Sequence, residues 1–112
     1  MKKIIVKDKF SDILTNRNEL QGDGKNTAID FRKNFLKEYE SEDAWRNGSE
    51  EIEFDFSGVK KISPSFANEA FAHFLKFTDL KKFSEKIKFS NTTKVQKMII
   101  EQELKVAKEK RK

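Results

Sequence analysis

The stretch EIEFDFSGVKKISPSFANEAFAHFLKF, Glu51 to Phe77, joins a strand pattern to a helix pattern. At its start, Ile52, Phe54 and Phe56 alternate with three acidic residues. A period of two places successive side chains on opposite faces of a strand, so the apolar groups share one face and the carboxylates share the other. This alternation predicts an amphipathic strand whose Phe54 face is buried.

A helix is predicted after this strand. Ser63-Pro64-Ser65 is typical of a helix start, because a Ser hydroxyl can cap free backbone N–H groups and Pro is tolerated in the first turn. Glu69 follows in the early turns, where the helix dipole favours an anion. Apolar residues then recur at three- and four-residue spacing: Phe66, Ala67, Ala70, Phe71, Phe74, Leu75 and Phe77. We expect this side of the helix to pack on the Phe54 face.

A further strand–helix unit is expected before the central one. A strand from Lys3 to Phe10 precedes a polar loop from Asn16 to Lys25. Asn26 or Thr27 is then expected to cap a helix that ends near Glu40, and a polar linker from Ser41 to Ser49 leads back to the sheet. The linker contains Trp45, which would be either a lid on the core or an exposed contact residue, and we favour the lid.

Another unit is expected after the central one. The alternating segment from Lys86 to Ser90 predicts a strand, and Asn91 or Thr92 is expected to cap a last helix. The residues expected to form the buried stripe of that helix are Val95, Met98, Ile99 and Gln102 or Val106.

The order of elements is therefore β-α-β-α-β-α, which predicts an α/β fold with a small, mainly parallel sheet. Because the strands alternate apolar with charged residues, the helices are expected to cover mostly one face of the sheet. A chain of 112 residues suits one domain, residues 1–112, with a basic helix end at about residues 105–112. An exposed sheet edge also makes a homodimer a candidate assembly.

Charge and composition exclude several function classes. The chain has no Cys, and the N-terminal apolar run is too short for a signal peptide or a membrane span, so a cytoplasmic protein that does not enter membranes is expected. The last eight residues, KVAKEKRK, carry five basic groups and one acid, a net +4 of the total +5. The interpretation we favour is a solvated helix end, and the alternative is a nucleic-acid-associated accessory protein that uses this tail.

Few residues suggest an enzyme. His73 is the only histidine and lies within the Phe-rich helix, so we expect no metal site and no cofactor. Glu53 and Asp55 share a strand face without a partner for acid–base work, and a solvated sheet face is the favoured interpretation. Gly22-Asp23-Gly24 lacks the spacing of a phosphate-binding loop and is expected to be a turn. The chain is therefore predicted to have no catalytic residues.

Three serines gather around the turn between strand and helix: Ser57, Ser63 and Ser65. On physical grounds alone their favoured role is capping. The alternative is that they accept phosphate, which would change a protein-binding surface by nearly two negative charges.

The segments DFSGV (residues 55–59) and ISPSFANE (residues 62–69) resemble the STAS-like domain family of bacterial proteins, and more distantly the STAS domains of anti-sigma factor antagonists. The resemblance implies a regulatory, partner-switching type of module that binds a kinase-like ATP-binding or anti-sigma-type protein. The residues implied in binding are Ser57, Gly58, Ser63, Pro64, Ser65, Asn68 and Glu69. Ser63 and Ser65 are candidate phosphoacceptors by proximity, because Pro64 stands where the antagonists carry the phosphorylated serine.

Overall fold

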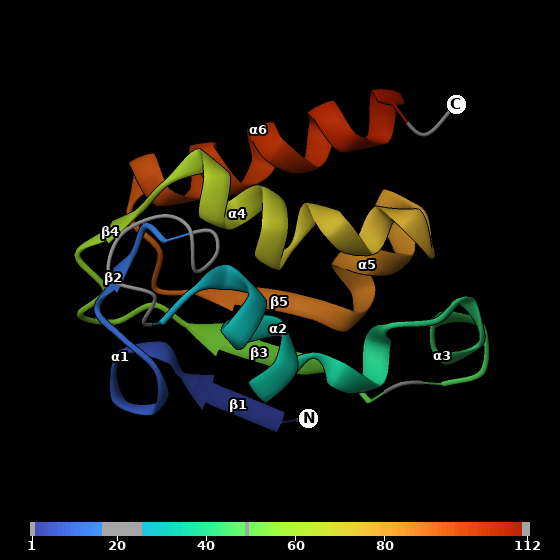
Figure 1. Cartoon of the computed structure of the whole chain (residues 1–112), viewed down its shortest axis with the longest axis horizontal. Helices are drawn as coiled ribbons and strands as arrows, with labels where there is room; N and C mark the ends of the chain where they lie inside the picture. Colours follow the sequence, from blue (N-terminus) through green and yellow to red (C-terminus); the bar gives the residue numbers. More distant parts are fainter. Residues whose placement is uncertain (1, 17–25, 49, 111–112) are drawn as a thin grey trace.

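Three parallel strands form the main sheet of the computed structural model, which describes residues 2–16, 26–48 and 50–110 (Figure 1). The strands are β1 (Lys2–Ile5), β3 (Ile52–Asp55) and β5 (Ile87–Ser90), in the spatial order β1-β3-β5. Phe54 lies opposite Ile4 on one side and opposite Phe89 on the other. The α/β class and the parallel sheet predicted from the sequence are confirmed.

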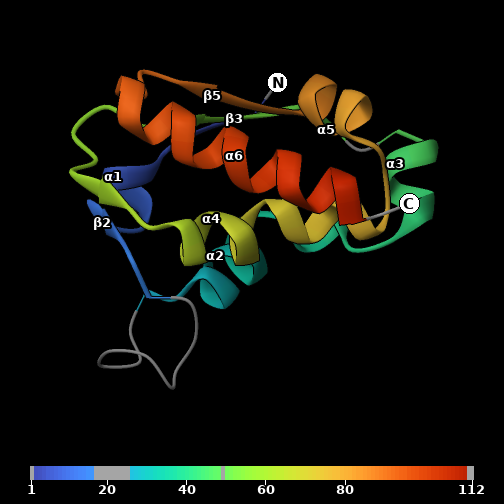
Figure 2. The same ribbon diagram turned by 90° about the horizontal axis from the view of Figure 1, so that it is seen from above.

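Helices cover one face of this sheet. Figure 2 shows the strands along one side of the molecule, with α2 (Ala28–Phe35), α4 (Pro64–Ala70) and α6 (Lys94–Lys110) on the other. The opposite face of the sheet carries charged groups, and the Lys3 ammonium lies 3.9 Å from Glu53 Oε2. The predicted one-sided cover therefore agrees with the alternation of apolar and charged residues along the strands.

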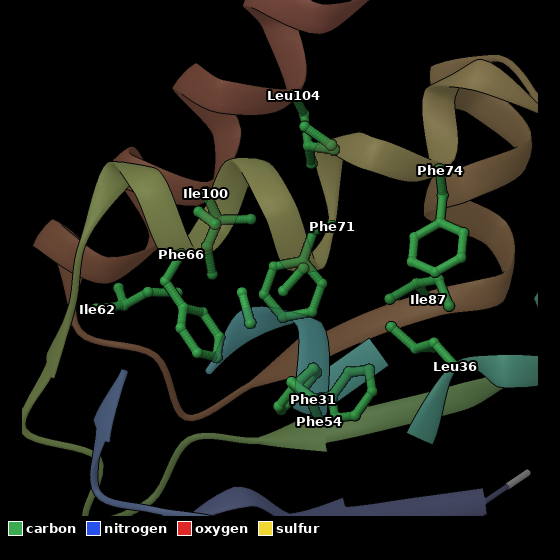
Figure 3. Close-up of a cluster of buried hydrophobic side chains, with 14 of the residues drawn as sticks. Phe31, Leu36, Phe54, Ile62, Phe66, Phe71, Phe74, Ile87, Ile100 and Leu104 are labelled. Atoms are coloured by element: carbon green, nitrogen blue, oxygen red, sulfur yellow. The ribbon is translucent and has the colours of Figure 1, made fainter. Parts of the chain in front are cut away.

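The core is built from phenylalanines of the central strand and the helices (Figure 3). Phe31 of α2 is fully buried, and the centre of its ring lies 5.0 Å from that of Phe54 and 5.4 Å from that of Phe71. The Phe66 ring also contacts Phe31, at 5.7 Å. The predicted packing of the α4 segment against the Phe54 face is thus present, with Phe31 between several of the rings.

A second, two-stranded sheet lies beside the main one and was not predicted. Its strands, β2 (Ile13–Leu14) and β4 (Lys61–Ile62), run parallel, and the Ser63 N–H continues the pairing by donating to Leu14 O at 2.9 Å. Two residues give too short a pattern for recognition in a sequence. This sheet holds the chain in place immediately before α4.

Four predicted element boundaries are wrong. The first strand ends at Ile5 because Val6 begins the short helix α1 (Val6–Lys9). At the end of this helix, the N–H groups of Phe10 and Ser11 both donate to Val6 O. The helix expected to reach Glu40 ends at Phe35 and is followed by a 3-10 turn, η1 (Lys37–Tyr39). The last strand begins at Ile87, one residue after the expected start, because Lys86 ends α5 (Leu80–Lys86).

The helix expected to continue to Phe77 also ends early. Phe71 leaves the helical conformation at φ −122° while its side chain stays fully buried, and a 3-10 turn, η2 (Ala72–Lys76), follows. The linker before β3 contains the short helix α3 (Glu42–Arg46). Its Trp45 is 4% exposed and stacks on Phe83, which confirms the lid interpretation.

The expected buried stripe of α6 is wrong at Val95 and Met98, while Ile99 packs against the core as expected. Val95 and Met98 are 65% and 60% exposed, while Gln96, Ile100 and Leu104 are buried. The predicted caps are also wrong, because Thr93 exchanges hydrogen bonds with Gln96: the Thr93 hydroxyl accepts from the Gln96 N–H, and the Gln96 side chain accepts from the Thr93 N–H. The Gln96 amide then donates to Val59 O at 2.9 Å, which sets the rotation of the helix.

Candidate functional site

The residues that the sequence singles out lie at one end of the molecule, where β3 and β5 finish and α4 and α6 begin (Figure 1). In open parallel sheets, the carboxyl ends of the strands are where ligands commonly bind. Two segments are presented there: the turn after β3 and the first turn of α4. Each is described below from the contacts that hold it.

Asp55 fixes the turn after β3. Its Oδ1 accepts from the Ser57 backbone N–H at 2.8 Å and from the Asn91 side-chain amide at 3.0 Å, while Lys3 Nζ lies 3.6 Å from Oδ2. The Asn91 amide and the Ser57 N–H hold the pKa of the Asp55 carboxyl well below its usual range. Asp55 is only 6% exposed, so the expectation of a solvated residue is wrong for this carboxylate.

The Asn91 contact was missed by sequence reasoning, although the parallel register contains a signal for it. Asp55 pairs with Ser90, so the residue after β5 lies next to the end of β3. Asn91 adopts φ +54°, a left-handed conformation that Asn tolerates better than most residues. The ends of both strands are therefore joined by side chains that a strand pattern alone does not reveal.

The turn itself faces solvent. Ser57 and Gly58 are exposed, and the Val59 N–H closes the turn on Phe56 O at 3.0 Å. Gly58 has φ +79°, and a Cβ there would lie 2.7 Å from Lys7 Cδ of α1. Glycine is thus required by the backbone conformation and also leaves room for the Lys7 side chain.

Ser63 is the cap of α4, as predicted. Its hydroxyl accepts from the Phe66 N–H at 3.1 Å and donates to Thr15 O at 3.4 Å, while Pro64 occupies the first helical position. The Ser63 hydroxyl therefore acts both as an acceptor and as a donor of hydrogen bonds within the fold. A phosphate on Ser63 would remove the hydrogen that is donated to Thr15 O, while its oxygens would still accept from the N–H groups of the first turn.

Pro64, Ser65 and Asn68 form a surface of their own, here called the α4 surface. Phe66, Ala67 and Ala70 occupy the buried side of the helix, and at 100° per residue the three surface residues lie on the opposite side. Pro64 is exposed, and Ser65 and Asn68 are half-buried. Within the described ranges, no hydrogen bond of the Ser65 hydroxyl is found.

Glu69 points away from the α4 surface, toward α2. Its carboxylate pairs with the guanidinium of Arg32, and Arg32 Nε lies 3.4 Å from Glu40 Oε1. His73 completes the group, with Nε2 2.7 Å from the same Glu40 oxygen. Burial, together with the Arg32 charge, lowers the pKa of His73 below its ordinary value. This cluster ties α2 to α4 and η2, and an external partner would compete with Arg32 for Glu69.

A shallow groove begins at Asn68 and runs between η2 and the second half of α6. Its volume is about 330 Å³, and Asn68 shares its lining with Ala72, Leu75 and Val106. Lys76 and Lys110 also line it. The α4 surface therefore continues into a partly apolar hollow with two cations.

Several other expectations concern the rest of the chain. Gly22-Asp23-Gly24 lies outside the described residues. In the described ranges, no group of three or more His, Cys, Asp or Glu residues could hold a metal ion, and no helix is long and apolar enough to cross a membrane. Lys105, Lys108 and Lys110 are exposed at the end of α6.

Comparison with family models gives one match. Residues 27–97 match the model of a family described as a STAS-like domain of unknown function, DUF4325. The matched range extends from the cap of α2 into the first turns of α6 and contains the turn after β3 and the whole of α4. Comparison with curated proteins gives no significant match, and neither does comparison with solved structures.

Proposed function

The chain belongs to the family of STAS-like domains of unknown function, and we propose that it is a non-enzymatic regulatory module that binds another protein. The binding region is the α4 surface together with the Ser57–Gly58 turn. The proposed partner is a kinase-like ATP-binding or anti-sigma-type protein, in a partner-switching system of the kind that the likeness to STAS domains implies.

One observation carries this proposal: one side of α4 faces outward beside an exposed turn, and both segments are held firmly in the fold. Ser63 caps the helix, Asp55 fixes the turn and Glu69 pairs with Arg32. Pro64, Ser65 and Asn68 are on the outward side of α4. Polar and small residues on a rigid helix, beside an exposed turn, make a surface suited to recognition by another protein.

Ser65 is the proposed phosphoacceptor within this surface. The Ser63 hydroxyl is occupied by its two hydrogen bonds, whereas Ser65 is accessible on the outward side of the helix. A phosphate on Ser65 would add nearly two negative charges to the α4 surface and leave the cap intact. Modification would thereby change which partner the module binds.

Comparative capture of the partner from the native host tests the proposal. The wild-type chain is used as bait beside Ser65→Asp and Asn68→Arg, and the captured proteins are quantified by mass spectrometry. Both variants are expected to lose the partner while their circular dichroism spectra stay unchanged. Asn34→Asp and Asn34→Arg are matched controls, because Asn34 is exposed on α2 and the same charges are introduced there.

The controls are expected to retain the partner. Equal capture by Ser65→Asp, Asn68→Arg and the wild type would rule out the α4 surface as the binding region. Mass spectrometry of the chain itself, isolated from the host, tests the modification, and phosphate on Ser63 instead of Ser65 would contradict the assignment of the acceptor.

A further inference from the structure

The outer edge of β5 is open. β5 pairs with β3, and no other strand pairs with it within the described part of the chain. Ser90 O accepts from the Phe56 N–H at 2.8 Å, so the backbone groups of Ser90 point toward β3. Because these groups alternate along a strand, the N–H and C=O of Phe89 point the other way, toward the open edge.

A groove lies beside this edge, between β5 and α6. It has a volume of about 350 Å³ and is here called the β5 groove. Its apolar lining comes from three elements and consists of Phe83, Ile87, Phe89, Ile100 and Leu104. A strand that paired with Phe89 would place alternate side chains into this hollow, which is the arrangement by which extended peptides add to sheet edges.

The surroundings of the β5 groove are basic. Lys88, Lys97 and Glu101 are the charged residues of its lining. Between Leu80 and Ser90 the chain carries four lysines and one glutamate, a net charge of +3. Three of these lysines are on α5, which leads directly into β5, and this excess of cations beside the groove favours an occupant with negative charge.

We propose that the β5 edge binds an acidic peptide in an extended conformation, as a fourth strand of the sheet. The peptide exchanges backbone hydrogen bonds with Phe89 and places apolar side chains in the β5 groove. Carboxylates on its other side face Lys88, which lies on the sheet face opposite to Phe89, and an acidic residue beside the groove meets Lys97 of α6. This site is separate from the α4 surface, and the proposal holds whether or not that surface binds a partner.

A second copy of the chain is a poorer occupant on electrostatic grounds. Pairing of two β5 edges would bring Lys88 and the lysines of α5 close to their own counterparts, and like charges placed opposite each other are destabilising. Lysine on an edge strand is also a device that proteins use against self-association. The same lysines attract a strand that carries acids.

Selection from a random peptide library, with the full 112-residue chain as bait, tests the proposal. The enriched peptides are expected to alternate acidic with apolar residues and to bind more weakly as the salt concentration rises. Lys88→Glu/Lys97→Glu is expected to weaken their binding about tenfold or more, since two attractions become repulsions. Lys105→Glu, an exposed change on α6 outside the groove lining, is the control and should bind nearly as well as the wild type.

Amide hydrogen exchange separates strand addition from simple attraction of charges. The Phe89 amide should exchange fast in the free chain and become protected when a selected peptide is bound. The proposal is overturned by a library without acidic enrichment, by unchanged binding to the double variant, by an unprotected Phe89, or by Phe89 protection that comes from a dimer of this chain. Capture of the α4 partner by Lys88→Glu/Lys97→Glu is measured in parallel and should stay normal.

Discussion

Asp55 acquires a structural role from its place at the end of a strand. Its neighbours in the alternating pattern suggest a solvated carboxylate, but the residues beyond the ends of β3 and β5 surround it with donors. Such contacts depend on where two strands end relative to each other. The register of the strands determines this, and the local sequence pattern does not show it. The site-forming residue Asn91 was missed for the same reason.

Replacing Asn91 with glycine tests this role, because glycine keeps the left-handed conformation and removes only the amide. Asn91→Gly should raise the pKa of Asp55 toward its ordinary value and lower the melting temperature at pH 7. The stability that comes from a lowered carboxyl pKa is present above the ordinary value, near 4, and is lost as the pH falls further. The deficit in melting temperature should therefore shrink in acid, and a pH-independent deficit would contradict this account.

His73 can be followed alone, because it is the only histidine in the chain. Burial and the Arg32 charge lower its pKa, so an NMR titration should give a midpoint below about 6.5. Arg32→Gln should raise that midpoint, since the stronger of the two cations that oppose Glu40 is removed and only Lys76 remains. The neutral form stabilises the fold above about pH 6.5, and that stabilisation is lost as the pH falls. A wild-type midpoint above 6.5 would show that Glu40 dominates.

Among the elements, α6 departs most from its sequence pattern. Periodicity and polarity alone place the apolar Val95 and Met98 in the buried stripe and leave the polar Gln96 out of it. The structure buries Gln96 at 3% exposure, where its side chain bonds Thr93 and Val59. A buried amide whose oxygen and nitrogen both have hydrogen-bond partners can take a core position that composition assigns to an aliphatic residue.

Urea denaturation of two alanine variants tests the rotation of α6. Gln96→Ala removes the side chain that donates to Val59 O and accepts from the Thr93 N–H, so both backbone groups lose a hydrogen-bond partner. This variant should lower the free energy of unfolding by about 2 kcal/mol. Met98→Ala removes an exposed side chain and should change that free energy by less than about 0.5 kcal/mol. A larger loss of unfolding free energy in Met98→Ala than in Gln96→Ala would mean that the side of α6 predicted from the sequence is the buried one.

In α4, the structure separates the capping hydroxyl of Ser63 from the surface that we propose for recognition. Ser63→Ala removes the cap and should lower the unfolding free energy by about 1 kcal/mol. Ser65→Ala should leave the unfolding free energy within about 0.5 kcal/mol of wild type, because no hydrogen bond within the described residues depends on that hydroxyl. Thermal or urea unfolding of both variants checks this, and a large cost at Ser65 would mean that it holds the fold.

At the scale of the whole molecule, periodic patterns predicted how the main elements are arranged, although not the buried face of α6, and the short elements were not predicted. The three main strands, the one-sided cover by helices and the packing of the α4 segment on the Phe54 face were predicted from alternation and helical spacing, whereas the spatial order of the strands was not predicted. By contrast, α1, α3 and the β2–β4 pair have five residues or fewer, which is too short for a period to emerge. Tertiary contacts determine where these short elements form, and they also determine that α4 ends before Phe71.

The site was predicted in part. The sequence brought attention to the Ser57–Glu69 segment, and the structure divides it into residues that hold the fold and residues that face outward. Ser63 and Glu69 belong to the first group by their contacts, and Pro64, Ser65 and Asn68 to the second. That division depends on which side of α4 is buried, and the partner of Glu69 comes from α2, far away in the sequence.

The central claim is that a protein partner binds the α4 surface and the Ser57–Gly58 turn. Amide hydrogen exchange of the chain, measured with and without the partner captured by the wild-type bait, tests it most directly. New protection is expected at residues 57–58 and 65–69, with the open face of the sheet unchanged. Protection confined to Lys105–Lys110, or to strands β1, β3 and β5, would contradict it.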